Sequence, residues 1–170
     1  NYTVLLNTDS LNSGNRAIRT LIVSDSGNVI ITGSDSLNIL GNFVENGGNV
    51  EVDSNATTTI NIEGDFLLSD NSPPGKVASG KKSGFKAGKS KVKMKGNKKK
   101  RVGILQGQTG KLAAASQPVQ FWDWYINGDS TETVGTVEVK DNLTLNFNVT
   151  LGSKTVGEDV VYDTLVVSNG

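Results

Sequence analysis

Short runs of alternating apolar and polar residues fill most of the chain, and Gly, Asn, Asp and Ser separate them. A period of two places successive apolar side chains on one face of an extended segment, which predicts half-buried β-strands. Pairs that share a face in this way are Val50 and Val52, Ile60 and Ile62, Val137 and Val139, and Leu143 and Leu145. The intervals between runs leave no room for crossover helices, so the pattern predicts an all-β fold.

The alternating runs recur as an internal repeat. Residues 27–31 resemble 48–52 at an offset of 21, and residues 37–43 resemble 60–66 at an offset of 23. A third copy begins at Gly135 and has tighter spacing. A repeat of about 20 residues built of short strands has the size of one β-helix coil, and such coils bury their apolar faces by stacking.

We therefore expect a right-handed parallel β-helix, or β-solenoid, over 20–170, with an irregular lead-in or cap over 1–19. Loops rich in turn-forming residues should interrupt it near 69–84 and 106–118, and a lysine-rich section covers 76–111. A sandwich of β-hairpins is the alternative that the same alternation allows. Because the chain starts at Asn1, it has the character of a processed protein or a piece of a longer one.

The composition excludes several kinds of chemistry. The chain has no cysteine and no histidine, so disulfides, Cys/His zinc sites and imidazole-dependent nucleophiles are absent. No apolar run approaches the roughly 20 residues of a membrane span. The acidic turns at Asp25, Asp35 and Asp53 lack the spacing of calcium-binding solenoids, which favours solvated corners. We expect no enzyme activity, no cofactor and no metal.

The net charge of zero conceals a strong segregation of charge. Residues 71–122 contain 13 of the 17 basic residues and none of the 17 acidic ones. Stacked outward lysines there could bind an anionic partner through sequence-independent charge pairing. The candidates are Lys81, Lys82, Lys86, Lys89, Lys91, Lys93, Lys95, Lys98, Lys99, Lys100 and Arg101. Alternatively, these residues form a solvated face or pair with the acidic coils of the same chain or of another copy.

Several segments resemble the repeat signature of secreted and cell-surface β-solenoid proteins of Bacteroidetes. The residues that carry the resemblance are Gly41–Gly47, Gly64–Phe66, Val92–Gly96, Phe121–Asn127 and Val137–Phe147. Such proteins include adhesins and filament-forming proteins, often exported by the type IX route. The resemblance implies an extracellular or cell-surface location. The lysine-rich strand departs from the family, because the corresponding strand is usually rich in Thr or Asn.

The resemblance also implies where the only aromatic cluster points. Phe121, Trp124 and Ile126 would face inward with a corner between them, leaving Trp122 and Tyr125 exposed to stack on sugars or to meet a neighbouring chain. Glycosylation is a further expectation. Sequons occur at Asn55, Asn142 and Asn148, and sites similar to the family's O-glycan acceptors occur at Ser10, Ser36 and Thr164.

Together these observations predict a structural or adhesive module, or a filament subunit that assembles through complementary basic and acidic surfaces. Its partners would be further copies or flanking solenoid coils. The alternative is a module that binds, rather than cleaves, anionic surface polysaccharide through its lysine-rich face. Nucleic acid is disfavoured as a partner, because only Phe85 is interleaved with the lysines for base stacking.

Overall fold

The structure is a computed structural model that describes residues 2–10, 17–24, 27–69, 84–105, 119–127, 130–134, 137–146, 149–151, 153–156, 159–162 and 164–167. Most of these residues lie in β-strands, and their helical part is the single turn η1, Thr8–Ser10. The described residues include no helix that is long and apolar enough to cross a membrane.

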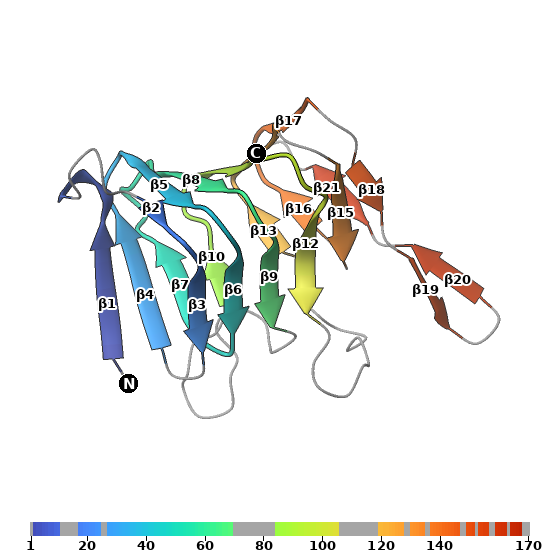
Figure 1. The fold of residues 1–170 in the computed structure, drawn as a ribbon, viewed down its shortest axis with the longest axis horizontal. Coiled ribbons are helices and arrows are strands. Elements are labelled where there is room, and N and C mark those ends of the chain that lie inside the picture. The colour runs from blue at the N-terminus through green and yellow to red at the C-terminus, as the bar shows by residue number, and fades with distance from the viewer. Residues whose placement is uncertain are drawn as a thin grey trace.

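Successive strands fall in turn on three parallel sheets, which we call the A, B and C walls (Figure 1). The A wall holds β1 (Tyr2–Asn7), β4 (Gly27–Thr32), β7 (Asn49–Val52) and β10 (Gly84–Lys86), then continues after an interruption as β13 (Val119–Phe121), β16 (Val137–Val139) and β21 (Leu165–Val167). The B wall holds β2 (Ala17–Ile18), β5 (Ser36–Ile39), β8 (Thr59–Ile62), β11 (Lys91–Met94), β14 (Asp123–Ile126) and β17 (Leu143–Leu145). The C wall holds β3 (Leu21–Ser24), β6 (Phe43–Asn46), β9 (Phe66–Ser69), β12 (Lys100–Leu105), β15 (Thr131–Val134) and β18 (Val149–Leu151).

Three consecutive strands, one in each wall, make a coil, and the coils are numbered from the N-terminus. Coil 3 is thus β7–β9, coil 4 is β10–β12 and coil 5 is β13–β15. The prediction of an all-β fold with stacked parallel strands is confirmed, because the ladders that join these coils are parallel. The hairpin sandwich is therefore wrong. The one antiparallel ladder between named strands joins β19 (Ser153–Val156) to β20 (Asp159–Tyr162).

The core consists of inward-facing side chains that stack in columns from coil to coil. In the B wall, Leu37, Ile60, Val92 and Trp124 occupy equivalent positions and are fully buried. Aromatic rings fill the space between the walls. Phe43 and Phe66 stack with ring centroids 4.5 Å apart, and Phe121 stacks on Trp124 at 5.2 Å. The inward positions predicted for Phe121, Trp124 and Ile126 are confirmed, and Val92 and Met94 are also fully buried.

Outward-facing polar residues form their own columns in coils 1 to 3. Asn49 donates its side-chain amide to Asn28 Oδ1 at 2.6 Å, and Asn28 donates to Thr3 Oγ1 at 3.2 Å. In the B wall Asn61 donates to Asn38 Oδ1 at 2.9 Å. Because identical amides repeat at one position of the coil, each can satisfy the next, which favours the observed register.

The start of the chain is more regular than expected. The anticipated lead-in over 1–19 contains β1, whose six residues pair in register with β4. Regular pairing therefore starts at Tyr2, ahead of the expected start near residue 20. The two expected loops lie outside the described residues for 70–83 and 106–118, with β9 ending at Ser69 and β10 starting at Gly84.

Candidate functional site

The described candidates for anion binding all come from coil 4 and its corners. This basic band consists of Lys86, Lys89, Lys91, Lys93, Lys95, Lys98, Lys99 and Arg101. It crosses all three walls, with Lys86 in the A wall, Lys91 in the B wall and Arg101 in the C wall. Lys81 and Lys82 lie outside the described residues. Within the described residues, the band occupies a single coil and its corners.

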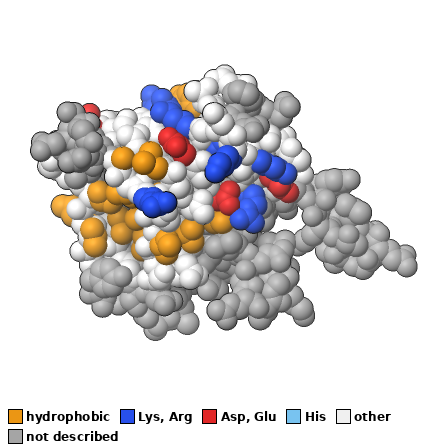
Figure 2. All heavy atoms as spheres, in the orientation of Figure 1, with side chains coloured by type: hydrophobic (Ala, Val, Ile, Leu, Met, Phe, Trp, Pro, Cys, Tyr) orange, Lys and Arg blue, Asp and Glu red, His pale blue; other side chains and the backbone are white. Residues whose placement is uncertain are grey.

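Three members of the basic band pair with acidic side chains of the adjacent coils. Lys86 Nζ lies 2.5 Å from Glu51 of coil 3, and Lys99 Nζ lies 2.8 Å from Glu132 of coil 5. Figure 2 shows basic and acidic groups side by side over the middle of the molecule. Part of the segregated charge is therefore neutralised within the chain itself, which was one of the alternatives that the sequence left open.

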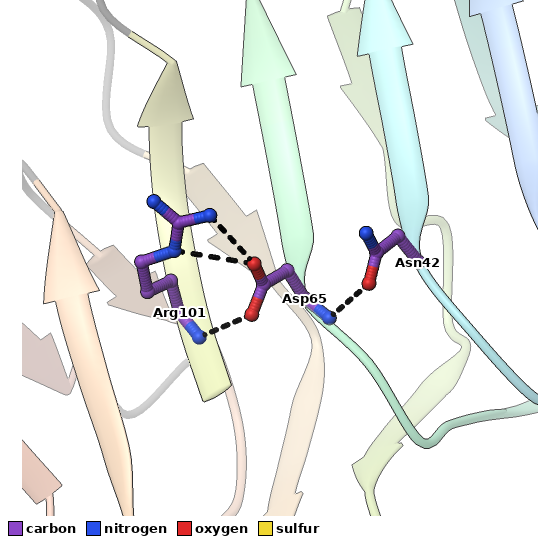
Figure 3. Close-up of polar contacts among 3 residues, drawn as sticks. All are labelled: Asn42, Asp65 and Arg101. Atoms are coloured by element: carbon purple, nitrogen blue, oxygen red, sulfur yellow. Dashed lines mark hydrogen bonds and ion pairs between the residues drawn. The ribbon is translucent and has the colours of Figure 1, made fainter. Parts of the chain in front are cut away.

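The third pair, between Arg101 and Asp65, belongs to a corner ladder that spans three coils (Figure 3). Arg101 donates its backbone amide to Asp65 Oδ1 at 2.8 Å, and its guanidinium donates to Asp65 Oδ2 from Nε at 3.1 Å and from Nη2 at 2.9 Å. The backbone amide of Asp65 in turn donates to Asn42 Oδ1 at 2.9 Å. Asp65 thus accepts three hydrogen bonds from Arg101, of which the two from the guanidinium meet at one carboxylate oxygen, and these bonds orient the Arg101 side chain toward its own protein.

Lys100 does not belong to the binding surface, and its inclusion among the candidates is wrong. Its side chain is only 1% exposed, and Nζ donates to the carbonyl oxygens of Gly96 at 3.1 Å and Lys98 at 2.6 Å. Alternation explains the burial, because Lys100 and the fully buried Val102 share the inward face of β12 while Arg101 points out. The same alternation in the sequence could have revealed it.

Lys91, Lys93 and Lys95 project outward from the B wall and form what we call the lysine row. Residues two apart on a strand are separated by about 6.6 Å, so the row is a line of evenly spaced cations. None of the three forms an ion pair with another described residue, and Lys89 and Lys98 extend the line at its two corners. Lys93 lies over the ring of Tyr125, with Nζ 5.3 Å from the ring centroid.

The lysine row is bordered by uncharged or acidic positions. In the ladder registers, Lys91 stands between Thr59 and Asp123, and Lys93 stands between Asn61 and Tyr125. Asp123 is itself buried and accepts two hydrogen bonds from Asn142, at 3.2 Å from the backbone amide and 2.9 Å from the side chain. In the described part of the B wall, the outward cations therefore lie on β11 and on Lys95, which directly follows it.

Trp122 and Tyr125 are both half-buried rather than fully exposed. Tyr125 has one neighbour in Lys93, which limits access to its ring. Trp122 lies at the corner between β13 and β14, where it lines a cavity of about 430 Å³. The other lining residues are Phe85, Lys86, Ala87, Gly88, Gln120, Phe121 and Lys140. Gln120 and Lys140 were not singled out from the sequence, because nothing in their local pattern marks a cavity between two coils.

The predicted glycosylation sites have different surroundings. Ser10, Asn55 and Thr164 are exposed, Ser36 is half-buried within β5, and Asn148 lies outside the described residues. Asn142 is exposed, but its amide nitrogen already donates to Asp123. Among the described residues no three acidic side chains lie close enough together to hold a metal ion.

Comparison with protein-family models, with curated proteins and with solved structures gives no match to this chain. The assignment of a function therefore depends on the coil architecture, the lysine row and the cavity.

Proposed function

We propose that this chain is a structural and adhesive module of a bacterial surface or extracellular protein, built as a right-handed parallel β-solenoid with coils of about 20 residues. Stacking against a further copy of the chain, or against flanking solenoid coils, is its principal interaction. Two observations support this assignment: the resemblance to secreted solenoid proteins, and the exposed apolar side chains at the two ends of the coil stack.

Exposed apolar side chains at the two ends of the coil stack carry this proposal. Val4 is 46% exposed, although it pairs in register with the buried Val29 and so belongs to an inward column. At the other end Leu145 is 48% exposed, although it pairs with the fully buried Ile126. Leu151 and Val167 are exposed for the same reason. Each end is therefore a cross-section of the core, and covering it with another coil would remove apolar surface from water.

Light scattering coupled to size-exclusion chromatography over a range of protein and salt concentrations tests the assembly. We expect the mean mass to rise with protein concentration, and the Leu145→Glu/Leu151→Glu variant to remain monomeric. The matched control is Ile22→Glu, which changes an exposed residue on the outer face of the C wall. A wild-type chain that stays monomeric at high concentration and low salt would overturn the assembly.

Salt dependence separates two forms of the same proposal. Contacts between complementary basic and acidic surfaces weaken as salt increases, because exposed charges are screened. Contacts between apolar coil ends persist or strengthen under the same conditions. Because Lys86, Lys99 and Arg101 already have acidic partners in the chain, we expect the apolar ends to dominate and assembly to persist at 0.5 M NaCl.

The second candidate function is binding of an anionic polysaccharide. The observation that favours it is the lysine row, whose three ammonium groups lack acidic partners among the described residues. A linear polyanion could lie along β11 and meet one cation about every 6.6 Å. Such binding would be electrostatic and would weaken steeply with salt.

Binding of polygalacturonate, a linear polymer of acidic sugars, tests the lysine row. We expect the Lys91→Ala/Lys93→Ala/Lys95→Ala variant to lose at least tenfold in affinity at low salt. The matched control is Arg19→Ala/Lys99→Ala/Arg101→Ala, which removes the same net charge from exposed positions outside the row. Equal losses in both variants would show that net charge alone matters, and equal retention in both would exclude the lysines as the binding surface.

A further inference from the structure

The A wall is interrupted between coil 4 and coil 5. Its strands are hydrogen-bonded in the orders β1-β4-β7-β10 and β13-β16-β21, and no ladder joins β10 to β13. The two strands nevertheless lie close, since the rings of Phe85 and Phe121 are 6.3 Å apart between their centroids. The edges of β10 and β13 therefore face each other without pairing through their backbones.

The cavity of about 430 Å³ opens at this interruption. Its volume falls in the range of about 300–1,000 Å³ that is usual for small-molecule sites. The buried rings of Phe85 and Phe121 contribute an apolar floor, and Trp122 contributes a half-buried indole. Such an aromatic lining suits the apolar face of a sugar ring.

Polar groups on the rim of the cavity favour an anionic ligand. Lys86 and Lys140 both line it, and each is ion-paired on the protein surface, with Glu51 and Glu138 respectively. Both lysine side chains are substantially exposed, and an ammonium group has three N–H donors, so each can bind a ligand carboxylate while it keeps its acidic partner. Gln120, which holds Glu138 Oε2 at 2.8 Å, adds an amide for hydroxyl groups.

The cavity and the lysine row are continuous along the chain. Gly88 lines the cavity, Lys89 follows it at the exposed corner between the A and B walls, and Lys91 then begins β11. Coil 5 has the same order of residues. Trp122 lines the cavity, and the next residue, Asp123, pairs in register with Lys91. A polymer that leaves the cavity at this corner would meet the lysine row directly.

We propose that this cavity is an anchoring subsite for one acidic sugar residue, from which the rest of an acidic polysaccharide runs along the lysine row. This inference deepens the second candidate function and rests on it. The indole of Trp122 packs against the sugar ring, Lys86 and Lys140 bind its carboxylate, and Gln120 binds a hydroxyl group. The polymer consequently lies across the solenoid, in the direction of β11.

The test compares a short ligand with a long one. Trigalacturonate places one sugar residue in the cavity and covers at most the near end of the lysine row, whereas polygalacturonate reaches both. We expect Trp122→Ala to weaken trigalacturonate binding at least tenfold, as measured by calorimetry, and Lys140→Glu to weaken it similarly. Lys140→Glu removes the ion pair with Glu138, so circular dichroism of the variant is needed to separate loss of ligand binding from loss of the fold. A neutral trisaccharide such as maltotriose should bind at least tenfold more weakly than trigalacturonate.

The variants separate failure of the subsite from failure of the lysine row. The Lys91→Ala/Lys93→Ala/Lys95→Ala variant should keep its trigalacturonate affinity and lose polymer affinity, which supports the subsite. If polymer binding depends on the row but neither Trp122→Ala nor Lys140→Glu changes any affinity, the subsite is overturned and the polysaccharide function stands. If neither ligand binds the wild-type chain, both are overturned. Equal affinity for maltotriose and trigalacturonate would overturn the acidic specificity.

Discussion

Coils 3 and 4 stack directly on each other, yet they differ in almost every outward-facing side chain. Apart from Lys100, the inward positions discussed above are apolar in both coils, with Val50 beside Phe85, Ile60 beside Val92 and Ile62 beside Met94. Their outward positions change from acidic or amide to basic, with Glu51 beside Lys86, Asn61 beside Lys93 and Asp65 beside Arg101. The apolar inward columns thus continue from coil to coil, whereas the outward side chains can change in charge without interrupting the stack.

The comparison also shows two ways to satisfy outward polar groups. Coils 2 and 3 are joined by neutral amide ladders such as that between Asn28 and Asn49. Coils 3 and 4 are joined instead by charged pairs, of which Arg101 and Asp65 form the best-ordered example. Neutral hydrogen bonds depend little on ionic strength, whereas exposed ion pairs are screened, so the two junctions should respond differently to salt.

The largest expected effect concerns the inward columns. Phe66→Ala should lower the free energy of unfolding by about 3–5 kcal/mol, because it leaves a cavity beside Phe43, Phe85 and Phe121. Lys93→Ala, an outward change in the adjacent coil, should alter it by less than about 0.5 kcal/mol. Chemical denaturation followed by circular dichroism measures both, and similar losses in the two variants would contradict the division into inward and outward columns.

The next effect concerns the close approach of coils at their corners. A Cβ atom at Gly64 would lie 2.2 Å from Asn42 Oδ1 and 2.6 Å from the backbone of Gly41, so Gly64→Ala should cost about 3 kcal/mol. Gly96 in coil 4 has a φ of +93°, but its added Cβ would approach nothing closer than 3.5 Å. Gly96→Ala should therefore cost only about 1–2 kcal/mol, from backbone strain alone. Thermal unfolding of both variants would show the difference, and the reverse order would indicate a looser corner at Gly64.

A third effect distinguishes lysines within coil 4. Lys100→Ala should cost about 2 kcal/mol, because it leaves the carbonyl oxygens of Gly96 and Lys98 without the donor that satisfies them. Each single alanine variant of the lysine row should fall within about 0.5 kcal/mol of the wild type. Denaturation in urea provides the comparison. A Lys100 variant as stable as the row variants would place its side chain in solvent.

The smallest effect concerns the outward junctions. A double-mutant cycle of Asp65→Ala and Arg101→Ala should give a coupling energy of about 0.5–1 kcal/mol, since Arg101 is more than half exposed. The coupling should fall at 1 M NaCl. The matched cycle of Asn28→Ala and Asn49→Ala should give a coupling that salt leaves unchanged. Equal salt sensitivity in the two cycles would remove the proposed distinction between amide and charged junctions.

Much of the fold could be predicted from the sequence because inward columns impose local alternation. The strict alternation of 91–95 correctly placed Val92 and Met94 inside and Lys91, Lys93 and Lys95 outside. The candidate site was harder to predict, because it depends on register between distant segments. Arg101 meets Asp65 across 36 residues, and that pairing depends on a long interval that has no repeat pattern. Lys100 is buried because it alternates with the outward Arg101 on β12, a position that its charge alone does not predict.

The interruption of the A wall also affects how the molecule bears load. Backbone hydrogen bonds run the length of the B and C walls, from β2 to β17 and from β3 to β18, but in the described part of the chain no ladder joins the A-wall strands of coils 4 and 5. Under tension along the solenoid axis, that junction transmits force through two walls instead of three. We therefore expect the A-wall side of this junction to open more easily than that of coils 3 and 4, where β7 and β10 are hydrogen-bonded.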